Sequence, residues 1–87
     1  MITKQVVAKK LLVYMQHQIT ASILINWAEN VMMEGDLEEN NADILSEIIA
    51  KIGLADVNNF GLLWEDCDEM MQKLGYHIKV EALLVAA

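Results

Sequence analysis

The sequence contains no proline and no arginine, and only one of its 87 residues is cysteine. Without arginine the chain lacks the guanidinium fork that grips phosphate groups and guanine, and its net charge of −7 repels polyanions. Both features argue against nucleic acid as a partner. A single cysteine excludes an internal disulfide, so the cytoplasm is the expected compartment.

Long uncharged apolar runs are also missing. Lys4, Lys9 and Lys10 interrupt the early apolar stretch, so we expect no signal peptide. No run approaches the roughly 18 residues that a membrane span requires, and we expect no membrane partner. The chain has the length of one domain, residues 1–87, and 55% of its residues are hydrophobic. That fraction is enough to form a core.

The chain has no proline, so its glycines are the residues that mark the boundaries of helix-length segments. Apolar residues recur at helical spacing in four segments, roughly 3–16, 20–34, 41–53 and 63–74. Thr3 is the expected N-cap of the first helix, and Gly35, Gly53 and Gly75 are expected just after helix ends. The apolar stripes predict a core made of Val7, Ala8, Leu11, Leu12, Tyr14, Met15, Ile23, Leu24, Trp27, Ala28, Val31, Met32, Leu45, Ile48, Ile49, Ile52, Leu63, Cys67, Met70, Met71 and Leu74. Trp27 and Trp64 are expected to anchor the core, and either one at its margin would make an interface hot spot.

After Gly75 the apolar period changes from helical to two. Tyr76, Ile78 and Val80 alternate with polar residues, which is typical of a strand. No second segment alternates convincingly, so we expect this strand to pair with its own copy in a homodimer or with a strand of another protein. A frayed tail, or pairing with an irregular loop, is the alternative. The predicted fold is mainly α, a small bundle of about four helices with a single C-terminal β-strand.

Negative charge is concentrated in the middle of the chain. Between Glu29 and Glu69 there are twelve acidic residues and one lysine. Glu65, Asp68 and Glu69 lie on the polar side of the last expected helix, where they are candidate contacts for a basic partner protein. A solvated anionic surface without a partner would explain the same residues.

Candidate catalytic and metal-binding residues are few. His17, His77 and Cys67 are the only candidates for a nucleophile with its base, and no spacing links them. The segment from Asp36 to Glu47 has oxygen side chains at some positions of a calcium-binding loop, but Asn41 stands where the turn glycine belongs. We therefore expect no enzymatic activity, no cofactor and no metal.

Short phrases in the sequence carry a resemblance to known proteins. Trp27-Ala28-Glu29, Gly53-Leu54-Ala55-Asp56-Val57, Trp64-Glu65-Asp66-Cys67 and Leu74-Gly75-Tyr76 resemble phrases of short bacterial proteins without an assigned activity. The segment Ile19–Glu29 is also similar to the helical opening of colicin-type immunity proteins, in which a short loop precedes a helix containing Trp-Ala-Glu. This resemblance implies a small acidic helical protein that binds and blocks a toxin. It assigns no functional residue, and the expected C-terminal strand departs from it.

Together these patterns predict a non-enzymatic protein-interaction module of the bacterial cytoplasm. An acidic immunity or antitoxin-like inhibitor of a basic protein is its most specific version, and a structural or regulatory homodimer of unknown ligand is the alternative. The apolar end, Leu84–Ala87, resembles bacterial degradation tags, but we expect it to pack against the protein.

Overall fold

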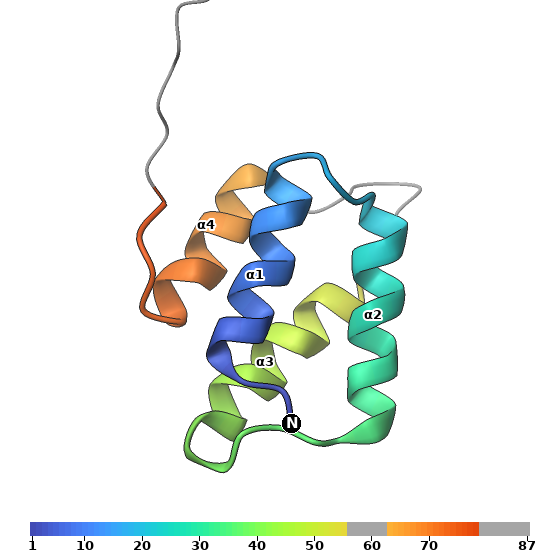
Figure 1. The fold of residues 1–87 in the computed structure, drawn as a ribbon, viewed down its shortest axis with the longest axis vertical. Helices are drawn as coiled ribbons and strands as arrows, with labels where there is room; N and C mark the ends of the chain where they lie inside the picture. Colours follow the sequence, from blue (N-terminus) through green and yellow to red (C-terminus); the bar gives the residue numbers. More distant parts are fainter. Residues whose placement is uncertain (56–62, 79–87) are drawn as a thin grey trace, which may run out of the picture.

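The computed structural model describes residues 1–55 and 63–78. Within these residues the chain forms four α-helices and one short 3-10 turn (Figure 1). Helix α2 packs most extensively on α3, whereas α1 contacts both α2 and α4. The prediction of a mainly helical bundle is confirmed. The elements are α1 (Lys4–Met15), α2 (Ala21–Glu34), η1 (Glu39–Asn41), α3 (Ala42–Gly53) and α4 (Trp64–Lys73).

Local sequence sets the ends of the first two helices. Thr3 and Thr20 each accept, through the side-chain oxygen, a 3.3 Å hydrogen bond from the backbone N–H three residues later. These bonds satisfy N–H groups that have no partner within the helix. Gly35 follows the last residue of α2, and its φ of 66° lies in the left-handed region, which glycine adopts at little cost because it has no Cβ atom. The predicted roles of Thr3 and Gly35 are confirmed.

Gly53 has a different role from the one expected. It does not follow α3 but is the last residue of that helix. A Cβ atom built on Gly53 would lie only 2.8 Å from Sδ of Met32 and 3.8 Å from Cγ of Glu29, both on α2. The missing side chain therefore allows α3 to approach α2 closely at this point.

One apolar face of each helix contributes to the core. The buried residues are Val7, Ala8, Leu11, Met15, Leu24, Ile25, Ala28, Val31, Leu45, Ile48, Ile49, Ile52, Cys67, Met70, Met71 and Leu74. Most expected stripes are thus confirmed, and Tyr14 and Trp27 pack at the edge of the core.

Some expected core residues lie on the surface instead. Ile23, Leu63 and Trp64 expose 50%, 60% and 46% of their surface, and Leu12 and Met32 are also exposed. Helix α2 is apolar around most of its circumference, so its periodicity does not determine which side faces inward. Packing against α3 decides the orientation.

A single β-bridge ties the first residues to the connection between α2 and α3. Ile2 pairs in parallel with Leu37. The Ile2 N–H donates to the carbonyl of Asp36 and the Glu38 N–H donates to the carbonyl of Ile2, both over 2.8 Å. These two bonds hold the segment before α1 against the far end of α2.

The predicted C-terminal strand is not confirmed. Residues 1–55 and 63–78 contain no strand beyond the isolated bridge, and Tyr76 and Ile78 are among the described residues outside any strand. Val80 and the segment Leu84–Ala87 lie outside the described residues. No helix in the described ranges combines the length and the apolar character needed to cross a membrane.

The close approach at Gly53 predicts an energetic coupling with Met32. In the wild-type protein, Gly53→Ala should change the free energy of unfolding little, because the gain in helix propensity is offset by displacement of the Met32 sulfur. In a Met32→Ala background the same substitution should stabilise the protein by about 0.5–1 kcal/mol. Urea unfolding of the four proteins in this double-mutant cycle measures the difference. Equal effects of Gly53→Ala in both backgrounds would contradict the described packing.

Candidate functional site

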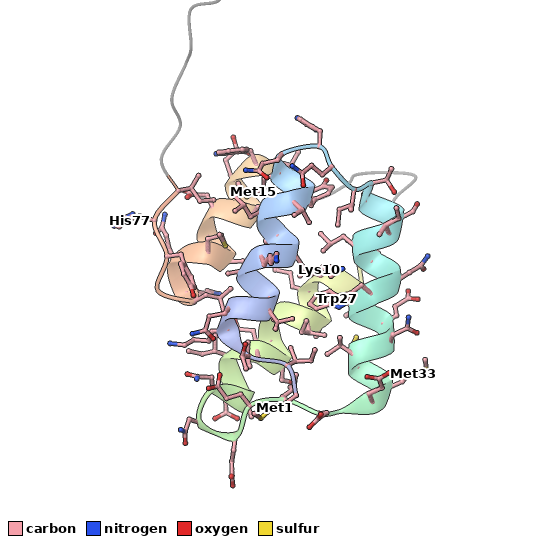
Figure 2. The ribbon with its side chains drawn as sticks, in the orientation of Figure 1. Met1, Lys10, Met15, Trp27, Met33 and His77 are labelled. Carbon is pink, nitrogen blue, oxygen red and sulfur yellow. The ribbon has the colours of Figure 1, made fainter. Side chains whose placement is uncertain are left out.

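The end of α1 and the start of α4 enclose a hollow of about 140 Å³. It is lined by Tyr14, Met15 and His17 on one side and by Trp64 and Cys67 on the other. Met15 marks its position at the end of α1 in Figure 2. Two of the three catalytic candidates, His17 and Cys67, therefore line one hollow although no sequence spacing connects them.

The chemistry of this hollow is not that of an activated thiol. Burial first, and then the negative charge of Asp66, raise the pKa of Cys67 to about 11, while Lys51 lowers it in part. Cys67 is therefore a protonated thiol at neutral pH, and such a thiol is a poor nucleophile. His17 is exposed, in the turn after α1, with a φ of 62°.

The third catalytic candidate lies elsewhere. His77 is exposed beyond the end of α4, where it borders a shallow depression with Gln72, Gly75 and Tyr76 (Figure 2). The fold thus does not bring His77 to the hollow at the start of α4.

The acidic connection between α2 and α3 forms local bonds. Residues Glu39–Asn41 are a 3-10 turn, and Nδ2 of Asn41 donates to Oε2 of Glu38 over 3.0 Å. In the described part of the chain, no three or more His, Cys, Asp or Glu residues are grouped so that they could hold a metal ion.

Glu69, one of three candidate contacts for a partner, belongs to a small charge cluster. Its Oε1 lies 3.8 Å from Nζ of Lys73, and the same Nζ lies 3.0 Å from Oε1 of Glu47 on α3. The hydrogen bond with Glu47 is the main reason why the pKa of Lys73 is raised, and Glu69 adds to it. Lys73 is shared by the two carboxylates and lies closer to Glu47, so it offsets only part of the negative charge at Glu69.

Glu65 and Asp68 form no ion pair within the described part of the chain. Glu65 is exposed and has no ion-pair partner among residues 1–55 and 63–78. Asp68 accepts a 3.1 Å hydrogen bond from Nε2 of Gln72, which leaves its charge uncompensated. Trp64 lies one turn before Asp68, on the same side of α4. We call Trp64, Glu65 and Asp68 the Trp64 surface.

Trp64 is exposed, which differs from the expected role of a core anchor and agrees with the alternative of a marginal position. Cys67, Met70, Met71 and Leu74 have the spacing of a complete helical stripe, and all four are buried. This stripe leaves Trp64 at its edge rather than at its centre. Tryptophan is large and apolar, which favours a core position, but the place of Trp64 in the helix does not.

The candidate strand-pairing residues differ in their environments. Tyr76 is exposed, and its N–H donates to the carbonyl of Met71 over 2.9 Å. Ile78 is half-buried and packs against the core. Val80 lies outside the described residues, and pairing of this segment with another chain stays a prediction.

The protonated state of Cys67 has a testable consequence. A pKa of about 11 instead of 9 lowers the thiolate fraction at pH 8 about 100-fold. We therefore expect Cys67 to react with an aromatic disulfide reagent at least about 100-fold more slowly in the native protein than in urea. Absorbance of the released thiol measures both rates. A native rate within about tenfold of the unfolded rate would contradict the burial of this thiol.

Comparison with protein-family models, with curated proteins and with solved structures finds no match to this chain.

Proposed function

We propose that this chain is a non-enzymatic protein-interaction module of the bacterial cytoplasm that binds a basic partner protein through the Trp64 surface. The observation that carries the proposal is Trp64 itself, which is 46% exposed beside two carboxylates whose charge is not compensated.

An exposed tryptophan at the margin of a core is a costly feature for a protein without partners. The indole ring contributes a large apolar area, and tryptophan is enriched among residues that dominate binding energy. Leu63, which precedes Trp64, is also exposed. Covering both side chains would remove apolar surface from water, which favours association.

The charges define the chemistry of the partner. A lysine or arginine side chain can place its cation over the indole face and extend toward Glu65 or Asp68. The hollow beside Trp64, about 140 Å³, suits the apolar part of one partner side chain rather than a whole small ligand. The net charge of −7 would attract a basic protein before contact is made.

An immunity or antitoxin-like role is the most specific form of this proposal. A toxin or nuclease that acts on nucleic acid presents a basic cleft, which an acidic module with an aromatic anchor can cover. The similarity of Ile19–Glu29 to the opening of colicin-type immunity proteins supports this form. Trp64 lies outside the similar segment, so its role rests on the exposed surface alone.

Cross-linking from the Trp64 surface tests the proposal. A photo-reactive phenylalanine derivative is placed at position 63, which is exposed and precedes Trp64, and, as a control, at position 34, which is exposed at the end of α2. In cells that make the protein, we expect the first variant to capture a basic protein in stoichiometric amount and the second not to capture it. Capture of its own copies alone would contradict the proposal and favour the homodimer.

The same surface should govern the rate of association with the captured protein. We expect Glu65→Gln with Asp68→Asn to lower the association rate constant about tenfold at low salt, and much less at high salt, because screening weakens charge steering. The matched control, Glu34→Gln with Glu39→Gln, removes the same charge from exposed positions elsewhere and should have a smaller effect. Stopped-flow fluorescence measures the rates. Equal effects of the two pairs, or rates independent of salt, would contradict the role of the Trp64 surface.

A further inference from the structure

The outward side of α1 carries a mixed apolar and basic stripe. Val6, Lys9, Lys10 and Val13 line a shallow depression on this helix. Their spacing of three, four and seven residues places them in one row on the helix surface. This row faces away from the core, and Val6 is 37% exposed.

Helix α2 continues this stripe. Nζ of Lys10 lies 5.7 Å from the ring centroid of Trp27, and Figure 2 shows the two side chains next to each other between α1 and α2. Ile23, one turn before Trp27, is half exposed. We call this set the α1–α2 face: Val6, Lys9, Lys10, Val13, Ile23 and Trp27.

The α1–α2 face is the basic part of an acidic protein. Helix α1 has no acidic residue, and among the described residues none of its lysines, Lys4, Lys9 and Lys10, has a carboxylate partner. The two other lysines of the described part, Lys51 and Lys73, are both ion-paired. The unpaired positive charge of this part is thus gathered on one helix, beside exposed apolar side chains.

We propose that the α1–α2 face binds an amphipathic helix of another protein, in which an apolar stripe is flanked by Asp and Glu. The apolar stripe would cover Val6, Val13 and Trp27, and the flanking carboxylates would meet the unpaired lysines. Helix α1 has 12 residues and is about 18 Å long, which matches three turns of a partner helix. This site is separate from the Trp64 surface and has the opposite charge.

The charge of the rest of the molecule favours a short partner helix over a membrane, a nucleic acid or a second copy of the chain. A membrane or a nucleic acid extends beyond α1 and would be repelled by the net charge of −7. A second copy docked through the same face would set the three lysines of one α1 against those of the other. A helix of three or four turns avoids both repulsions.

A designed peptide tests the proposal in the full chain. The probe is a stapled 16-residue helix with leucines at helical spacing and glutamates beside them, and the comparison peptide has lysine in place of each glutamate. The protein carries Trp64→Phe, which leaves Trp27 as its only tryptophan. We expect the glutamate peptide to shift the emission of Trp27 and to bind at least about tenfold more tightly than the lysine peptide.

Matched variants identify the lysines responsible. Lys9→Gln with Lys10→Gln should weaken binding of the glutamate peptide about tenfold, as measured by the anisotropy of a label on the peptide. Lys51→Gln with Lys73→Gln removes the same charge away from the face and should change the affinity less than about twofold. Circular dichroism checks that all variants keep their helices.

Several results would overturn the proposal. These are no binding at millimolar peptide, equal binding of the two peptides, or equal weakening by the two pairs of substitutions. Self-association through α1, or retention on vesicles of anionic phospholipid or on polyuridylic acid that is lost in the Lys9/Lys10 variant, would assign the face to a different occupant.

Discussion

The close contact between α2 and α3 is the constraint on which the other elements depend. Gly53 has no side chain, so α3 can approach the side of α2 that carries Met32. This pair has the most extensive helix contact in the described fold and provides the surface on which α1 and α4 complete the core. Once α2 is oriented by α3, Leu24 and Ile25 face inward and Ile23 faces out. The apolar part of the α1–α2 face is thus a consequence of core packing.

Two of the ion pairs connect α4 to α3. Lys73 binds Glu47 of α3, and Lys51 of α3 lies 4.0 Å from Asp66, so both lysines help to hold α4 against α3. Within the described part of the chain, the lysines of α1 have no carboxylate partner, and Glu65 and Asp68 beside Trp64 have no lysine partner. Exposed ion pairs of this kind contribute little to stability individually. Trp27 thus lies beside a lysine without an ion-pair partner, and Trp64 lies beside two carboxylates without one.

Features encoded by neighbouring residues could be predicted from the sequence. The N-cap at Thr3, the C-terminal glycine at Gly35 and the stripe of α3 each depend on a few adjacent positions, and all are present. The orientation of α2, the contact at Gly53 and the exposure of Trp64 depend on segments far apart in the chain. Periodicity carries no information about such contacts.

The candidate site shows the same limit. Glu65 and Asp68 could be placed on the polar side of α4 from their spacing, and both lie there. That Lys73 would pair with Glu47 as well as with Glu69 could not be foreseen, because Glu47 belongs to another helix. The hollow shared by His17 and Cys67 likewise exists only because the end of α1 meets the start of α4.

The central claim is that the fold places one tryptophan beside negative charge and the other beside positive charge. Fluorescence quenching of two single-tryptophan proteins, Trp27→Phe and Trp64→Phe, by caesium and by iodide measures this directly, with acrylamide as the neutral reference. Relative to acrylamide, Trp64 should be quenched more by caesium than by iodide, because Glu65 and Asp68 attract the cation. Trp27 should show the reverse preference, because Lys10 lies over its ring. The same ratio of caesium to iodide quenching at both tryptophans would contradict the account.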